Sequence, residues 1–262
     1  MDKETAIVPC VIAYIIFLMG VVILYGALTR VHRLAGITAL CLLALTPLYA
    51  KIAAYQGADT LTGLFILVTL VLSVLSDTRP YGLVVFLTGW FCGFTGWTKN
   101  EGIAFAVIFS GLFLWHHRHK GTANAFFIAG LVLPVAVVSC FKIFLAPSND
   151  IIEGQGMEAA NKLLDVARHK TILNFFLKTS LDCYLSLLML APVVFVIRFK
   201  TWRTYQMAAL LLLLVTYYFT FVLTPRNLTW HLETAAERLF IQLLPGFLFV
   251  LLNALFSRNK AL

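Results

Sequence analysis

Charged side chains are scarce in this chain of 262 residues. Asp, Glu, Lys and Arg together make up 12% of it, whereas hydrophobic residues make up 61%. A soluble domain carries about 25% charged residues, so the composition excludes an ordinary soluble protein. It predicts an integral membrane protein, because a membrane-spanning helix needs about 20 consecutive, mainly apolar residues.

Several kinds of functional motif are also missing. The five cysteines lie apart in apolar stretches, without the paired spacing of a metal site or a disulfide framework. There is no glycine-rich phosphate loop, no Ser/His/Asp arrangement and no nucleic-acid-binding motif. His116, His117 and His119 fall in one basic segment and are interpreted as solvated. The sequence therefore predicts no nucleic-acid partner and no certain cofactor, and it leaves a divalent metal open.

Long uncharged stretches alternate with short polar segments along the whole chain. They predict an all-α, polytopic transmembrane bundle of about nine helices, forming a single transmembrane domain over residues 1–262. The stretches cover residues 5–29, 34–50, 60–76, 80–98, 102–115, 121–141, 183–197, 204–225 and 239–257.

The formal net charge of +8 is unevenly distributed. Basic residues gather in four short segments, which share one face with residues 77–79 if the helices alternate. These segments are 30–33, 116–120, 198–203 and 257–260. Cytoplasmic loops carry the Lys/Arg excess, so this face is expected to be cytoplasmic. The N-terminus would then be extracytoplasmic and the C-terminus cytoplasmic.

Two turns on the expected extracytoplasmic side carry charges close to the spans. Asp59 opens a span, where it either caps the helix N-terminus or faces a cavity as a metal ligand or an anchor for a sugar hydroxyl. Lys99 and Glu101 lie between two spans, the second only about 21 Å long at 1.5 Å per residue. Their turn is expected to dip into a protein-lined pocket; the alternative is an interfacial turn with snorkelling charges.

A third polar segment, residues 230–238, leads into an apolar run and is predicted to be helical. One face of that helix is formed by His231, Thr234, Arg238 and Gln242. Arg238 would point towards the bilayer, where a guanidinium binds a lipid-linked phosphate through bidentate hydrogen bonds. The alternative is that Glu233 or Glu237 neutralises it from a neighbouring turn.

Residues 146–178 are expected to form an extracytoplasmic loop, helical over 157–169. Its apolar residues share a face in the manner of a helix on the membrane surface, with Lys162, Asp165 and Arg168 more exposed. The loop is either an interfacial connector or a lid over a cavity.

Three motifs follow one another in an informative order. Leu45-Thr46-Pro47 precedes Tyr55-Gln56-Gly57-Ala58-Asp59; glycines at 89, 93 and 96 run into residues 98–102; and an acidic-Arg-aromatic run before proline spans residues 237–245. This order resembles that of the GT-C superfamily of membrane glycosyltransferases, which use polyprenyl-phosphate sugars. Protein O-mannosyltransferases and the lipid A aminoarabinose transferase belong to that superfamily.

The resemblance implies an enzyme of the cell envelope, in a bacterial plasma membrane. It would transfer a sugar from a polyprenyl-phosphate donor to a lipid, glycan or protein acceptor at the extracytoplasmic face, among membrane lipids. Arg238 and Lys99 would hold the phosphate, and Asp59 and Glu101 would contact the sugar or the acceptor. The expected substrate-binding residues are completed by His231 and Gln242.

One departure from the family concerns its catalytic base. GT-C enzymes carry an acidic pair in the first extracytoplasmic loop, after an N-terminal helix, whereas this chain opens with Met1-Asp2-Lys3-Glu4 and enters a later helix directly. The catalytic residue is therefore unknown, and the chain is expected to be the C-terminal portion of such a module. Two other classes stay open, a transporter or flippase for a lipid-linked sugar and a non-catalytic subunit or remnant.

Overall fold

The computed structural model describes residues 7–55, 57–146, 156–197 and 204–257, and every regular element in these ranges is an α-helix. The helices are α1 (Ile7–Thr29), α2 (Arg33–Ala44), α3 (Pro47–Ala54), α4 (Ala58–Thr78), α5 (Gly82–Thr98), α6 (Asn100–His116), α7 (Gly121–Phe144), α8 (Gly156–Leu164), α9 (Val166–Ile197), α10 (Tyr205–Leu223) and α11 (Leu228–Phe256).

Five of these helices are long and apolar enough to cross a membrane, namely α1, α4, α7, α10 and α11. A sixth span results if α2 and α3 are taken as one bent span, and α5 is apolar but shorter. The predicted all-α, multi-pass membrane class is therefore confirmed. The predicted number of about nine spans is not, because uncharged stretches such as 34–50 and 80–98 fold into helices shorter than a standard span.

The stretch 34–50 shows how this difference arises. Two helices replace the single predicted span, and their axes bend by 69° between Ala44 and Pro47. Pro47 has no N–H for the helix ladder and disfavours the helical conformation at Thr46. The Thr46 hydroxyl donates instead to the carbonyl of Leu42 at 3.0 Å. The α2 helix alone is about 18 Å long, which is too short to cross a hydrocarbon core.

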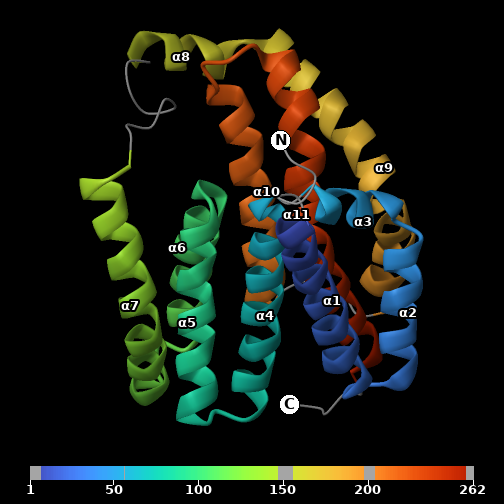
Figure 1. The fold of residues 1–262 in the computed structure, drawn as a ribbon, viewed down its shortest axis with the longest axis vertical. Coiled ribbons are helices and arrows are strands. Elements are labelled where there is room, and N and C mark those ends of the chain that lie inside the picture. Colours follow the sequence, from blue (N-terminus) through green and yellow to red (C-terminus); the bar gives the residue numbers. More distant parts are fainter. Residues whose placement is uncertain (1–6, 56, 147–155, 198–203, 258–262) are drawn as a thin grey trace.

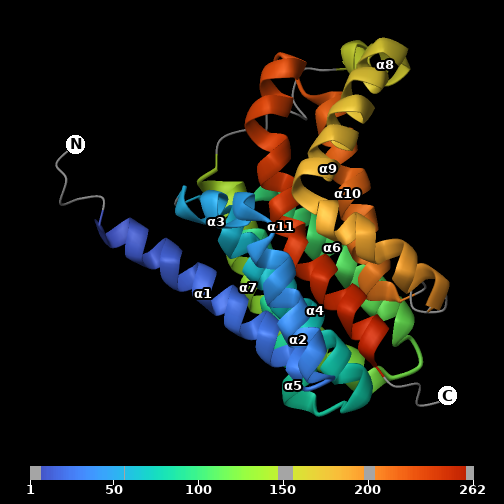
Figure 2. The same cartoon turned by 90° about the vertical axis from the view of Figure 1, so that its right-hand side faces the viewer.

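Helix α11 is the central helix of the bundle (Figure 1). Of its apolar 18-residue stretch, 83% is buried, and the helix packs on α4, α9, α10 and α1. In α1 and α7, only 17% of the corresponding stretch is buried, and large apolar side chains cover the outer faces of these helices. These two helices present the surfaces suited to lipid. In Figure 2 the N-terminal half of α1 leans away from the bundle.

Glycines allow α5 to approach both of its neighbours closely. A Cβ on Gly89 of α5 would lie 2.1 Å from the carbonyl oxygen of Phe127, and one on Gly130 of α7 would lie 2.0 Å from that of Phe86. Small residues of this kind bring helix backbones together in membranes. In the α5–α6 hairpin, a Cβ on Gly102 would lie 1.8 Å from the Thr95 carbonyl oxygen, so the turn between these two helices is tight.

Most of the described part of the segment 146–178 is helical. Helix α8 runs across one end of the bundle in Figure 1, and α9 follows it directly. Asp165 separates the two helices, because its Oδ1 accepts hydrogen bonds from the N–H groups of Ala167 and Arg168 at 3.0 and 3.1 Å. The predicted single helix over 157–169 is thus divided between α8 and α9. Residues 170–178, which were predicted to belong to a loop, are part of α9. Residues 147–155 lie outside the described part.

The expected exposure of Arg168 is wrong. Its side chain is half-buried and donates three hydrogen bonds to carbonyl groups at the C-terminal end of α10. The distances are 2.8 Å from Nε to Val222, and 3.1 Å from Nη2 to both Phe221 and Thr224. The last carbonyls of a helix have no partner within the helix, so Arg168 acts as a C-terminal cap supplied by another helix.

Candidate functional site

The two ends of the bundle differ in the charges that they hold. The end formed by Ala58 of α4, Thr98 of α5 and Asn100 of α6 is named the cavity end. The opposite end, formed by Thr78, Gly82 and His116, is named the basic end, and both can be followed in Figure 1. Helix α11 enters from the cavity end, and Arg238 lies in its third turn.

A buried carboxylate at the cavity end binds side chains from two other segments, the turn between α5 and α6 and helix α11. Asp59 lies in the first turn of α4 and is 2% exposed. Its Oδ1 accepts hydrogen bonds from Lys99 Nζ at 2.5 Å and from Gln242 Nε2 at 2.6 Å. Its Oδ2 lies 2.9 Å from Arg238 Nε and 2.8 Å from Arg238 Nη2. The two residues bridged by the bidentate pair are 179 positions apart in the sequence.

These contacts assign Asp59 a positioning role. An ionised carboxylate has about four acceptor positions, and four N–H donors occupy them. Asp59 also lies in the first turn of α4, where the helix dipole favours a carboxylate. The cluster of one carboxylate and two cations carries a formal charge of +1. Asp59 fixes Arg238 and Lys99 in place within this cluster.

The network continues into the core through Gln242. Its Nε2 donates to Asp59, and its Oε1 accepts a hydrogen bond from Tyr217 of α10 at 3.1 Å. Both Gln242 and Tyr217 are 1% exposed. Nearby, the hydroxyls of Thr62 and Thr98 bond at 2.8 Å and join α4 to α5. Buried polar groups that satisfy one another in this way favour one arrangement of the helices.

A cavity of about 410 Å³ lies beside this network. Two helices supply most of its wall, α3 on one side and the first turns of α11 on the other. Its lining residues are Leu48, Lys51, Ile52, Tyr55, Gly57, Asp59, Glu233, Thr234, Glu237 and Arg238. The volume falls within the range of small-molecule sites, about 300–1,000 Å³. The cavity combines two cationic side chains, Lys51 and Arg238, with three carboxylates, of which Glu233 and Glu237 are exposed on α11.

An apolar groove of about 280 Å³ lies between α1 and α3. It is lined by Cys10, Ala13, Tyr14, Phe17, Ala50, Ala53 and Ala54. Helix α3 therefore borders a polar cavity and an apolar groove. The groove forms where the exposed N-terminal part of α1 faces the small side chains of α3.

The structure brings together four of the six predicted substrate-binding residues, namely Asp59, Lys99, Arg238 and Gln242. Of the six, Asp59 and Arg238 line the cavity, whereas Lys99 and Gln242 contact Asp59 from outside its lining. His231 does not line the cavity; its Nδ1 lies 2.9 Å from Thr224 Oγ1, and its ring packs on Phe221 with centroids 4.8 Å apart. Glu101 is half-buried in the first turn of α6, close enough to His231 and Tyr217 to act on both electrostatically. The predicted helix through Arg238 is present as α11.

Two findings differ from the expected chemistry of this site. The partner of Arg238 is Asp59, whereas the sequence offered a phosphate or a glutamate one turn away. Lys51, Tyr55 and Tyr217 were not predicted as site residues. Lys51 lies on α3 and Tyr55 directly follows that helix, four positions later; this spacing, and the place of Tyr55 in the motif that leads to Asp59, were the signals in the sequence. Tyr217 lies in an apolar run, where nothing marks one tyrosine over its neighbours.

Comparisons with known proteins found no matching family, no matching curated protein and no matching solved structure.

Proposed function

We propose that the chain is a membrane glycosyltransferase of the GT-C type, or part of one, that acts on a polyprenyl-phosphate-linked sugar at the extracytoplasmic face. The observation that carries the proposal is the Asp59–Arg238 pair beside the 410 Å³ cavity. Arg238 is half-exposed at the cavity, and Asp59 holds it through Nε and Nη2. A guanidinium held in this way presents its remaining N–H groups in a fixed direction, as phosphate binding requires.

In the proposed reaction, the cationic side chains of the cavity bind the phosphate and a carboxylate accepts a proton. The bond between the sugar's anomeric carbon and the phosphate oxygen breaks, and a bond from the acceptor's hydroxyl oxygen to that carbon forms. Arg238 and Lys51 stabilise the negative charge on the departing polyprenyl phosphate. The hydroxyl proton passes to a carboxylate, and Glu233 and Glu237 are the acidic side chains of the cavity other than the fully bonded Asp59.

The apolar groove along α1 suits the other part of such a donor. A polyprenyl chain is apolar, and the groove lies across α3 from the polar cavity. A lipid-linked sugar phosphate needs a polar site for its head and an apolar path for its chain. This pairing favours a lipid-linked substrate over a water-soluble nucleotide sugar.

Binding and transfer can be measured on the purified protein in lipid nanodiscs with a radiolabelled polyprenyl-phosphate sugar. Arg238→Lys keeps the charge but loses the planar fork, so we expect binding weaker by about 1–3 kcal/mol. The matched control is Arg118→Lys, the same exchange at the basic end, which should bind as the wild type does. Thermal melting establishes that each variant is native.

Three outcomes separate the functional classes. Binding with transfer of label to an added acceptor supports the glycosyltransferase. Binding without transfer, sensitive to Arg238→Lys, favours a transporter or a non-catalytic subunit. Equal affinity in the wild type, Arg238→Lys and Arg238→Ala would remove Arg238 from the site and overturn the proposal.

A further inference from the structure

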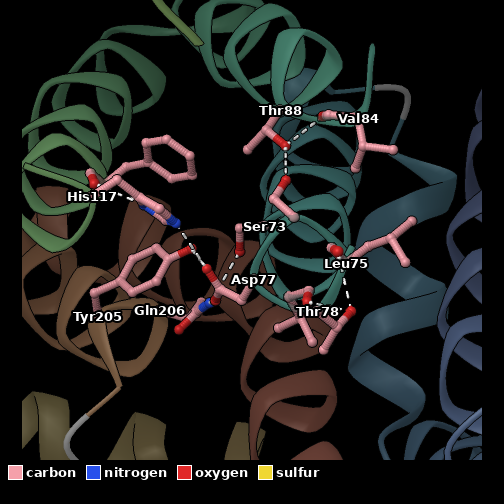
Figure 3. A network of polar contacts seen from close by, with 12 residues as sticks. Ser73, Leu75, Asp77, Thr78, Val84, Thr88, His117, Tyr205 and Gln206 are labelled. Atoms are coloured by element: carbon pink, nitrogen blue, oxygen red, sulfur yellow. Dashed lines mark hydrogen bonds and ion pairs between the residues drawn. The ribbon is translucent and has the colours of Figure 1, made fainter. Parts of the chain in front are cut away.

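A second polar cluster lies at the basic end of the bundle. Figure 3 shows His117, Tyr205 and Gln206 pointing toward Asp77 in the last turn of α4. Asp77 Oδ1 lies 3.1 Å from His117 Nε2 and accepts a hydrogen bond from the Tyr205 hydroxyl at 3.3 Å. Its Oδ2 accepts one from Gln206 Nε2 at 3.0 Å. Side chains from α10 and from the C-terminal end of α6 thus hold the carboxylate of Asp77 in a fixed orientation.

His117 is buried, with 3% of its surface exposed, so it is not the solvated residue that the basic segment suggested. Its Nδ1 lies 3.1 Å from the carbonyl oxygen of Phe113. A carbonyl only accepts hydrogen bonds, so Nδ1 carries a proton. The Nε2 atom of His117 faces Asp77 Oδ1 at 3.1 Å, a separation close to that of two ligands of one cation.

The neighbouring His116 completes a set of three ligand atoms. Its ring lies against that of Tyr205, with centroids 4.6 Å apart, and the donor atoms of Asp77, His116 and His117 all lie within 4.8 Å of one another. Ligands of a tetrahedral zinc ion with bonds of about 2.0–2.1 Å are about 3.3 Å apart. The Asp77–His117 pair is already close to that spacing. His116 is exposed at the end of α6, so a change of its rotamer can bring its ring nitrogen to the same spacing from Asp77 and His117.

The electrostatics of the two helix ends favour a cation here. Asp77 lies at the C-terminal end of α4, and His116 and His117 lie at that of α6, where the helix dipoles are negative. A carboxylate in such a position is destabilised unless a cation accompanies it. Arg118 and Lys120 oppose a cation, and both act on His116 electrostatically. Binding therefore has to come from coordination by the imidazoles, which selects transition metals over magnesium or calcium.

We propose that Asp77, His116 and His117 form a binding site for a divalent transition metal of the zinc class, with water as a fourth ligand. The hydrogen bond from His117 Nδ1 to the Phe113 carbonyl is the support that metal-bound histidines usually have, since it fixes the tautomer and leaves Nε2 for the metal. Tyr205 and Gln206 serve Asp77 in the same way. This site is independent of the glycosyltransferase proposal and lies at the other end of the bundle.

The test uses Co²⁺ as a spectroscopic substitute for zinc. The whole protein is purified without a polyhistidine tag, stripped with EDTA and titrated with Co²⁺ in detergent. We expect one equivalent to bind with the intense visible absorption of tetrahedral cobalt, and Zn²⁺ to displace it. Asp77→Asn, His116→Ala and His117→Gln should each weaken binding at least about tenfold. The matched control is His119→Ala, an exposed histidine outside the cluster, which should bind as the wild type does.

A second measurement does not depend on absorption. Zn²⁺ should raise the melting temperature of the wild type and of His119→Ala but not that of the three ligand variants. If the buried His117→Gln variant fails to fold, the exposed His116→Ala variant still decides the result. The proposal is overturned if the wild type shows no tetrahedral absorption, if His116→Ala binds Co²⁺ unchanged, or if His119→Ala loses binding equally.

Discussion

Gly63 of α4 and Gln242 of α11 are in backbone contact: a Cβ on Gly63 would lie 2.8 Å from the Gln242 carbonyl oxygen. Gly63 stands one turn below Asp59, and Gln242 is one of the residues that bind Asp59. The close approach of the two helices thus sets the distance over which the buried network forms.

Gly63→Ala should therefore destabilise the protein, by about 1–3 kcal/mol, because the new methyl group meets backbone atoms that cannot rotate away. The control is Gly111→Ala on α6, where a Cβ meets nothing within 4 Å. That change should be neutral or slightly stabilising, by up to about 1 kcal/mol. Equilibrium unfolding in mixed micelles measures both, and similar stabilities for the two variants would contradict the close contact.

The Asp59–Lys99 pair predicts energetic coupling. Asp59→Asn leaves two cations without their shared carboxylate and should lower the free energy of unfolding by about 2 kcal/mol, since hydrogen bonds to charged groups contribute about 1.5–3 kcal/mol. Lys99→Gln should cost less in the Asp59→Asn background than alone, with a coupling above about 0.5 kcal/mol. Lys142→Gln provides the comparison, because Lys142 donates to Asn100 at 2.7 Å outside the network. Its effect should add independently to that of Asp59→Asn.

Arg168 predicts local destabilisation of α10. Arg168→Lys cannot reach Phe221, Val222 and Thr224 together, so the end of α10 should fray, at a cost of about 1–3 kcal/mol. Hydrogen exchange of the amides of residues 219–226 should accelerate, while α4 keeps its protection. Lys170→Ala, a change at an exposed position of the same helix, should leave both regions unaltered. Unchanged exchange in Arg168→Lys would show that the three hydrogen bonds contribute little in solution.

The positive-inside rule predicts the orientation of the bundle. A single cysteine in place of Ala160 on α8 should react with a membrane-impermeant maleimide in intact cells. A cysteine in place of His119 should react only after permeabilisation. Both positions are exposed in the structure, so accessibility within the protein does not limit either reaction. The reverse pattern would place the cavity end in the cytoplasm and contradict the proposed extracytoplasmic reaction. Native cysteines are replaced beforehand by serine.

Local sequence signals predicted the parts of the fold that depend on composition and helical periodicity. The all-helical membrane class follows from hydropathy, and the helix through Arg238 follows from the apolar run after it. Pro47 was visible in the sequence, but its effect was missed because hydropathy counts apolar length and ignores the backbone. The resulting bend gives α3 its place in the cavity wall.

Contacts between distant residues could not be predicted in the same way. In the sequence, the acidic residues nearest to Arg238 are Glu233 and Glu237, which made a glutamate a candidate partner. The observed partner, Asp59, is brought to Arg238 by the packing of α4 on α11. His117 resembles its basic neighbours in sequence, but the end of α6 turns it toward Asp77 and away from solvent. In both cases the identity of the partner depends on which helices pack together, and a single sequence does not specify that.

The eight residues of α3 separate two environments that a lipid-linked molecule would occupy at once. Lys51 and Tyr55 border the polar cavity, whereas Ala50 and Ala54 border the apolar groove. Because α3 lines both spaces, a ligand that shifts α3 from one side would change the space on the other side, and the two occupancies would then be thermodynamically linked. By reciprocity, filling the groove changes affinity in the cavity by the same factor as filling the cavity changes affinity in the groove. If the proposed substrate fills both spaces, the short helix after the bend at Pro47 is the element that couples the binding of its chain to the binding of its head group.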